Sequence, residues 1–139
     1  SEVSVGEAMH KEVITVSPLC RISEVRDGIY RCNYTGFPVV DEGRLVGMIT
    51  FDDIRRIPPH EQEKMTVKEV AVRAPITINP HQSAKIAMDI RYENDVGRLA
   101  VVEKDDAQKR LGIITRMDVN RAYEREMKRS QDEASKQVG

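Results

Sequence analysis

The sequence has no tryptophan, two cysteines, few aromatic residues and no excess of either charge. Its 22 Lys and Arg against 23 Asp and Glu give a formal net charge of −1, which argues against a nucleic-acid partner. It also lacks an apolar run of about 18 residues and a charged-then-apolar leader, so we expect neither membrane insertion nor secretion. We therefore expect a cytoplasmic chain with one hydrophobic core.

Metal ligands and catalytic motifs are also missing. Cys20 and Cys32 fall near the two ends of one predicted helix, roughly 18 Å apart, whereas a disulfide needs Cα atoms within about 7 Å. The three histidines, His10, His60 and His81, have no ligand spacing to one another or to the cysteines. No phosphate-binding loop, nucleophile elbow or working pair of carboxylates is present. We expect no metal, no cofactor, no catalytic residue and no enzyme activity.

What the sequence does contain is an internal repeat. At an offset of 62, nine of 36 consecutive positions are identical without a gap, from Val5 and Val67 to Val40 and Val102. The offset then becomes 65, because one charged loop of the second copy carries three extra residues, a typical place for an insertion. Copies of about 60 residues are marginal alone, so we expect both to share one compact domain. The predicted boundaries are repeat one at 1–57, a polar linker at 58–64, repeat two at 65–123 and a fraying helical extension at 124–139.

Each copy reads as β-α-β-β-α, which indicates an α+β class. Apolar residues at i, i+3, i+7 and i+10 predict a helix over 21–33, and Ser83 is the expected N-cap of its counterpart over 83–93. Gly43 is expected to supply a positive φ in a hairpin turn, and Asp52 or Asp53 to cap a short helix ending at Ile57. The predicted strands cover 13–16, 37–40, 45–50, 76–78, 99–102 and 111–115.

Both copies end their last strand in Thr-x-x-Asp, with Thr50 and Asp53 in the first and Thr115 and Asp118 in the second. One interpretation is structural: each aspartate accepts backbone N–H bonds as an N-cap. The other is functional: each carboxylate accepts ligand hydroxyls beside a helix N-terminus that suits a phosphate. The residues alone favour the cap.

The order of these motifs, duplicated over Val5 to about Tyr123, resembles the CBS domain pair, also called the Bateman module. The resemblance implies two small three-stranded sheets with flanking helices in one compact domain, and two clefts that in this family bind adenine nucleotides such as ATP, ADP or AMP. Segments 33–40 and 114–124 look like the cytoplasmic tail of prokaryotic CLC chloride channels and transporters. That likeness implies a covalently attached upstream membrane domain. The alternatives are a free-standing energy sensor and a ligand-free dimerisation module.

The family combines the first strand and the loop before the central strand of one copy with the Thr-x-x-Asp of the other. The first predicted nucleotide site therefore comprises Thr15, Tyr34, Thr35, Gly36, Thr115 and Asp118. The second comprises Thr77, Val96, Gly97, Arg98, Thr50 and Asp53. In the family the aspartate binds ribose, and the position of Arg98 often carries a phosphate-binding base. Thr15 and Thr77 could equally be ordinary strand residues, and Arg98 a solvated surface side chain.

The helices over 21–33 and 83–93 offer more apolar face than one small domain needs, so we expect a homodimer. Met117 stands where some channel tails carry a basic residue, which argues against tight triphosphate binding in the first site.

Overall fold

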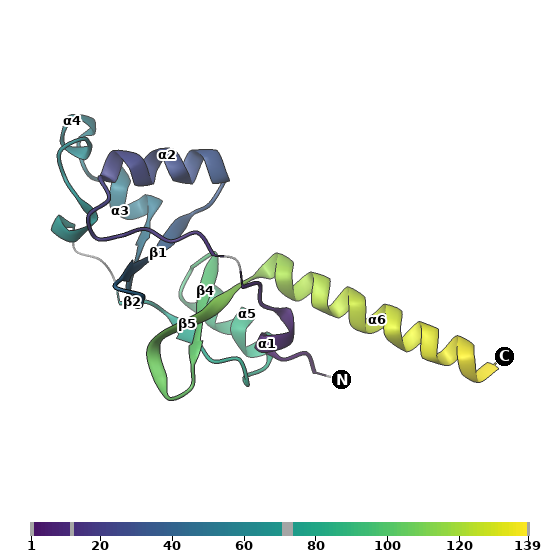
Figure 1. Cartoon of the computed structure of the whole chain (residues 1–139). Helices are drawn as coiled ribbons and strands as arrows, with labels where there is room; N and C mark the ends of the chain where they lie inside the picture. The colour runs from purple at the N-terminus through teal and green to yellow at the C-terminus, as the bar shows by residue number, and fades with distance from the viewer. Residues whose placement is uncertain (1, 12, 71–73, 139) are drawn as a thin grey trace. The chain divides into compact units, whose positions relative to one another are not determined.

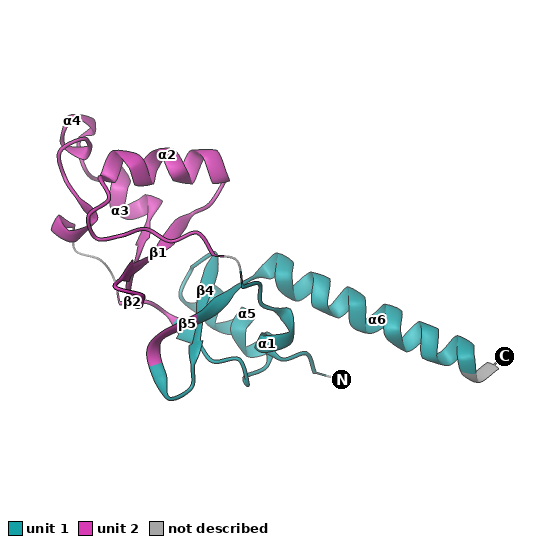
Figure 2. Cartoon of the chain, in the orientation of Figure 1, with its two compact units in different colours: residues 1–12, 77–106, 111–139 teal, residues 13–76, 107–110 magenta. Residues whose placement is uncertain are grey.

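The computed structural model describes residues 2–11, 13–70 and 74–138 and confirms an α+β fold with two small sheets (Figure 1). The chain forms two compact units (Figure 2). Unit 1 holds residues 1–12, 77–106 and 111–139, and unit 2 holds residues 13–76 and 107–110. The segment that leads into each repeat thus folds mainly with the other repeat. The units therefore cut across the repeat boundaries drawn from the sequence.

Unit 2 is built around one helix and one hairpin. Its elements are α2 (Ile22–Cys32), β1 (Gly36–Asp41), β2 (Arg44–Thr50), α3 (Phe51–Arg55), α4 (Pro59–Gln62) and the 3-10 helix η1 (Val67–Glu69). The predicted apolar face of α2 is confirmed, because Ile22, Val25 and Ile29 are buried in the core with Phe37. Asn33 ends α2 in the left-handed conformation, with φ 56°, and its N–H donates to Ile29.

The hairpin of unit 2 has the predicted turn. β1 and β2 pair antiparallel from Gly36 and Thr50 to Asp41 and Arg44. Gly43 has a φ of 78°, which confirms the expected positive value. The predicted strand over 13–16 is wrong, because only Val16 pairs there, in one parallel bridge to Val39.

Proline explains why this third strand is missing. The Val16 N–H donates to the Pro38 carbonyl at 3.0 Å, and the Val40 N–H donates to the Val16 carbonyl at 2.9 Å. The next step of a parallel ladder needs the N–H of residue 38, and proline has none. The sheet of unit 2 therefore has two strands where we expected three.

Within the predicted polar linker over 58–64, residues 59–62 form the short helix α4. Pro59 occupies the first turn of α4, and the side chain of Gln62 is only 5% exposed. Gln62 Nε2 donates to the carbonyls of Ile54 at 3.2 Å and Ile57 at 2.8 Å, and Oε1 accepts from Arg26 Nη1 at 2.9 Å. A buried polar side chain with all these partners fastens α4 to the end of α3.

Unit 1 contains a three-stranded sheet with strand order β3-β4-β5. Its elements are α1 (Val5–Ala8), β3 (Thr77–Ile78), α5 (Ala84–Glu93), β4 (Arg98–Glu103), β5 (Asp106–Thr115) and α6 (Arg116–Val138), although residues 107–110 of β5 group with unit 2. Ser83 caps α5 as predicted, because its side chain accepts from the Ile86 N–H. The helix α6 continues to Val138 and so includes most of the extension over 124–139 (Figure 1).

Candidate functional site

The two Thr-x-x-Asp turns have the same local geometry. In unit 2, Asp53 Oδ2 accepts from the Thr50 N–H at 2.9 Å and from the Thr50 hydroxyl at 3.0 Å. In unit 1, Asp118 Oδ2 accepts from the Thr115 N–H and hydroxyl, both at 2.9 Å. Thr115 Oγ1 in turn accepts from the Asp118 N–H at 3.2 Å. The strand-to-helix turn thus fixes each carboxylate by its own threonine.

These contacts correct the expected capping role. Thr50 is the N-cap of α3, and Asp53 is the third helical residue, where its carboxylate reaches back to Thr50. Neither Asp52 nor Asp53 is the N-cap, and α3 ends at Arg55 rather than Ile57. In such a capping box one carboxylate oxygen of the aspartate accepts from the backbone N–H of the N-cap residue.

Asp118 has a further partner that sequence reasoning missed. His10 Nδ1 lies 2.7 Å from Asp118 Oδ2, and the Asp118 residue is only 7% exposed. The two residues are 108 positions apart. Nothing in the local pattern around His10 signals this contact, because it depends on the pairing of the N-terminal segment with β5.

The loop before β1 contacts the Thr50 turn of the same unit. The Thr35 carbonyl accepts from the Phe51 N–H at 2.8 Å, and Gly36 pairs with Thr50. A Cβ at Gly36 would lie 2.4 Å from the Ile49 carbonyl oxygen, so no side chain fits there. The Tyr34 ring packs edge-on against Phe37 at 5.5 Å between centroids, so the ring faces the core.

The corresponding residues of unit 1 surround the start of β4. The Val96 N–H donates to the Arg91 carbonyl at 3.1 Å, as the Tyr34 N–H does to Ile29 in unit 2. Arg98 is the first residue of β4 and is half-buried. Thr77 pairs with Ala100 in the parallel part of the sheet. Thr15 of unit 2 is also half-buried and lines a hollow of about 330 Å³ beside α2.

Each unit therefore contains six of the predicted site residues, including its own Thr-x-x-Asp turn. Unit 2 holds Thr15, Tyr34, Thr35, Gly36, Thr50 and Asp53, and unit 1 holds Thr77, Val96, Gly97, Arg98, Thr115 and Asp118. Each predicted nucleotide site takes its members from both units. The combination of residues across the repeats stays a prediction.

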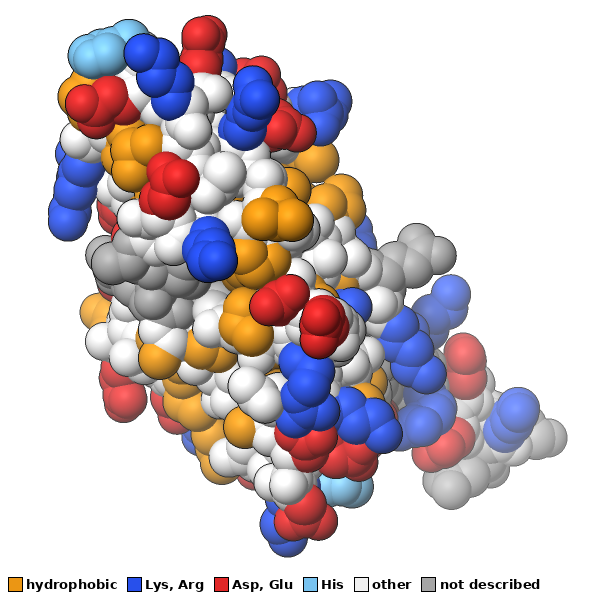
Figure 3. All heavy atoms as spheres, turned by 60° about the vertical axis from the view of Figure 1, so that its left-hand side comes forward, with side chains coloured by type: hydrophobic (Ala, Val, Ile, Leu, Met, Phe, Trp, Pro, Cys, Tyr) orange, Lys and Arg blue, Asp and Glu red, His pale blue; other side chains and the backbone are white. Residues whose placement is uncertain are grey.

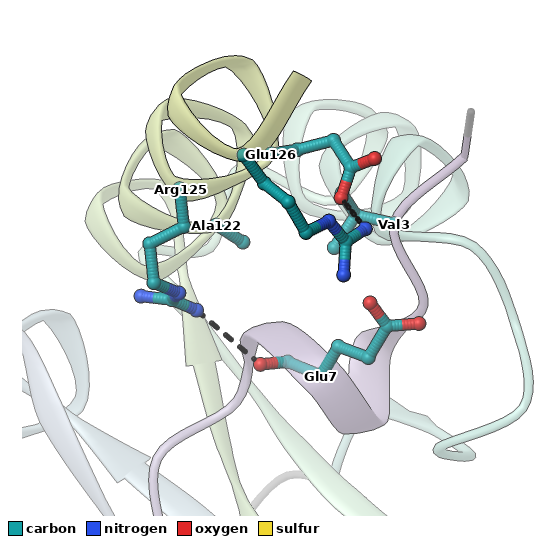
Figure 4. A pocket seen from close by; sticks show the side chains of 6 residues that line it. Val3, Glu7, Ala122, Arg125 and Glu126 are labelled. Carbon is teal, nitrogen blue, oxygen red and sulfur yellow. Dashed lines mark hydrogen bonds and ion pairs between the residues drawn. The ribbon is translucent and has the colours of Figure 1, made fainter. Parts of the chain in front are cut away.

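A second hollow lies in unit 1, and none of the predicted site residues line it (Figure 4). It measures about 220 Å³ and lies between α1 and α6. Arg125 Nη2 donates to the Glu7 carbonyl at 3.4 Å, and Arg129 is ion-paired with Glu126. Two arginines and two glutamates line it, so their charges balance. The bond from Arg125 to Glu7 links α6 to α1 at this hollow, and the balanced charges do not favour an anion there.

Charge and composition set further limits on the described residues. Acidic and basic side chains are interspersed on the face shown in Figure 3. Over residues 2–11, 13–70 and 74–138, no three His, Cys, Asp or Glu side chains cluster as metal ligands. Across the same residues, every helix is too short or too polar to cross a membrane.

Comparison with known proteins identifies the repeat. A family model described as the CBS domain matches residues 5–60 and 67–125. The uncharacterized protein MJ1232 of Methanocaldococcus jannaschii is 39% identical over 117 residues. That match covers 84% of this chain but 38% of MJ1232, so the chain spans well under half of this relative.

Two solved structures have the same fold. CBSX2 from Arabidopsis thaliana, in complex with AMP, is 25% identical with a TM-score of 0.73, and the match covers 88% of this chain and 96% of that one. The CBS domain pair of protein MJ0100, in complex with 5′-methylthioadenosine and S-adenosyl-L-methionine, is 26% identical with a TM-score of 0.71. Here the match covers 91% of this chain and 99% of that one.

Proposed function

This chain belongs to the CBS domain family, and we propose that it is a regulatory module that binds an adenine nucleotide and has no catalytic activity of its own. The observation that carries this proposal is the duplicated Thr-x-x-Asp turn. In each copy one carboxylate oxygen is held by the backbone N–H and hydroxyl of the threonine. A carboxylate held in this way is ready to accept ligand hydroxyls through charge-assisted bonds.

The chemistry of the relatives supports an adenine compound. CBSX2 is described in complex with AMP, and MJ0100 with two adenosine derivatives that carry sulfur at the 5′ position. All three ligands share adenine and ribose and differ in the group attached to the 5′ carbon. We therefore propose that the two turns of this chain recognise the ribose, and that residues such as Arg98 select the 5′ group.

A thermal-shift series tests this function. Purified chain is heated alone and with ATP, ADP, AMP or S-adenosylmethionine. A ligand that binds only the folded chain stabilises it by about 2.7 kcal/mol at 100 times its Kd. We expect at least one adenine nucleotide to raise the Tm, with guanosine and inosine monophosphates as matched controls that do not. A chain whose Tm is unchanged by every adenine compound would favour the ligand-free dimerisation module.

Which protein this module regulates is a separate question. The local resemblance of segment 33–40 to CLC channel tails supports attachment to a chloride channel on the cytoplasmic side. The relatives named above include no chloride channel, and the solved CBSX2 chain is about as long as this one. A free-standing sensor is the matching alternative. The gene sequence upstream of Ser1 separates them, because a channel tail must follow membrane-spanning segments.

We propose that two copies join through the helices α2 and α5. Tyr30 is 67% exposed on α2 and packs edge-on against Phe51 of α3, and Tyr92, the counterpart of Tyr30 in α5, is 85% exposed. Aromatic side chains this exposed, at corresponding positions of both repeats, suit a two-fold interface. Light scattering at tens of micromolar should give a dimer for the chain and a monomer for Tyr30→Lys. A monomeric wild-type chain would contradict this assignment.

A further inference from the structure

The polar cluster around Asp118 contains a residue outside the Thr-x-x-Asp motif. His10 Nδ1 lies 2.7 Å from Asp118 Oδ2, and the N–H and hydroxyl of Thr115 both lie 2.9 Å from the same oxygen. A carboxylate has about four lone-pair sites, two on each oxygen. Three donors therefore saturate Oδ2 and leave it no capacity for a ligand.

The other carboxylate oxygen of Asp118, Oδ1, differs from Oδ2 in its hydrogen bonding. Among the described residues, Oδ1 of Asp118 has no hydrogen-bond partner. It is also not one of the buried unpaired atoms, which in the described part of the chain are Arg91 Nε and Arg110 Nε. Oδ1 therefore reaches solvent and is the acceptor that Asp118 can offer.

The backbone holds His10 in place independently of its ring. The His10 N–H donates to the Ile113 carbonyl at 3.0 Å, and the Ile113 N–H donates to the His10 carbonyl at 2.9 Å. This close approach needs Gly112, because a Cβ there would lie 2.6 Å from the His10 carbonyl oxygen. The bond from Arg125 to the Glu7 carbonyl secures the same segment to α6. These main-chain bonds place the His10 imidazole beside Asp118.

The geometry points to His10 as a positioning residue for ligand binding: it occupies Oδ2 of Asp118 and leaves Oδ1 as the single acceptor for one ligand hydroxyl. The proton lies on Nδ1, because an ionised carboxylate only accepts hydrogen bonds. His10 makes the second Thr-x-x-Asp turn different from the first. At the repeat offset of 62 its counterpart is Val72, which lies outside the described residues and whose side chain has no donor. This inference rests on the proposed function, because it requires a hydroxyl-bearing ligand at Asp118.

Isothermal titration with ribose-modified nucleotides tests the role of His10. The probes are AMP, 2′-deoxy-AMP and 3′-deoxy-AMP, titrated into the full chain carrying Asp53→Asn, so that only the Asp118 turn is intact. Removing the one hydroxyl that faces Oδ1 should weaken binding about tenfold, the usual size for a bond to a charged group. Removing the other hydroxyl should change the Kd less than about twofold, because Oδ2 is already occupied.

Substitution of His10 should remove this discrimination. In His10→Ala the two Thr115 donors still hold Oδ2, but its third bond is lost and Oδ2 can accept a ligand hydroxyl. We therefore expect the two deoxy probes to bind alike, within about twofold. His10→Asn places an amide N–H near the position of Nδ1 and should restore the preference, whereas the longer His10→Gln should not. His81→Ala is the matched control, because His81 is an exposed histidine of unit 1 outside this cluster.

Each outcome decides one question. If His10→Ala keeps the hydroxyl preference of its parent, the inference is overturned and nucleotide binding stands. If His10→Ala does not fold, the Asn and Gln variants decide, and equal preference in both overturns the inference. If the wild-type chain binds no AMP under the same conditions, the proposed function fails and this inference fails with it.

Discussion

The first extended segment of each repeat pairs in parallel with the central strand of its unit, but the sheet of unit 1 has three strands and that of unit 2 has two. Val16 of unit 2 bridges Val39 in parallel, and the corresponding Ile78 of unit 1 pairs with Val101. In unit 1 the pairing continues to the preceding residue, and in unit 2 it stops. Duplication therefore preserved the plan of the repeat without preserving every hydrogen bond in it.

A single backbone donor separates the two sheets. Thr77 pairs with Ala100 in unit 1, and Pro38 occupies the position of Ala100 in unit 2. Because proline lacks the N–H that the parallel ladder needs, the segment over 13–16 keeps one bridge only. One residue on the central strand therefore decides whether the first segment of a repeat becomes a strand.

Transferring the proline to unit 1 should have the largest effect. Ala100 is completely buried on the central strand β4, so Ala100→Pro removes a ladder bond and forces a ring into a packed core. We expect the free energy of unfolding to fall by about 3 kcal/mol or more. Urea unfolding followed by far-UV circular dichroism measures this change. Ala100→Gly, which keeps the N–H, is the control and should cost about 1 kcal/mol.

The two Thr-x-x-Asp turns also lead into helices of different length. The short helix α3 follows the first turn, and the Gln62 side chain donates to carbonyls at its end, whereas the long helix α6 follows the second. Gln62→Leu would remove the two bonds from Gln62 Nε2 to the Ile54 and Ile57 carbonyls and the bond from Arg26 Nη1 to Gln62 Oε1. We expect a loss of about 1–3 kcal/mol in unfolding free energy. The position that corresponds in repeat two is Met127, 63% exposed on α6, and Met127→Leu should change stability by less than about 0.5 kcal/mol. Equal losses in the two variants would contradict this difference.

The reverse transfer should have the smallest effect on stability. Pro38→Ala supplies the missing N–H but also restores freedom to the unfolded chain, which costs about 0.4–1 kcal/mol. We therefore expect a net change in unfolding free energy within about 1 kcal/mol. The sharper measurement is amide hydrogen exchange, in which the new N–H at position 38 should be protected. Rapid exchange of that amide would show that proline is not what limits the sheet.

Local patterns predicted most of the fold. The helical spacing of Ile22, Val25 and Ile29 located α2, and Gly43 located the hairpin turn, because periodicity and positive φ are local properties. The bounds of the strands were correct to within a few residues for most elements. The missing third strand follows from Pro38, whose lack of an N–H is also a local property.

Long-range contacts were not readable in the same way. Gln62 looked like a linker residue, and its side chain is held by Arg26, 36 positions earlier, as well as by two nearby carbonyls. His10 had no neighbouring ligand pattern, and it meets Asp118 only because Gly112 admits the N-terminal segment against β5. The Thr-x-x-Asp turns were found from the repeat, but the role of the threonine as N-cap needed the structure.

We propose that Asp53 and Asp118 both bind nucleotide, and calorimetric titration of Asn variants at the two positions can show whether they do. AMP is titrated into the wild-type chain, Asp53→Asn, Asp118→Asn and the double variant, with Asp105→Asn in the exposed β4–β5 turn as control. Asn keeps an oxygen for the threonine but loses the charge. We expect each single variant to weaken one site by about 1.5–3 kcal/mol, more for Asp53 because Arg98 is predicted to share its site, and the double variant to lose binding. If the double variant keeps the wild-type affinity and stoichiometry, the two turns are structural and the account is wrong.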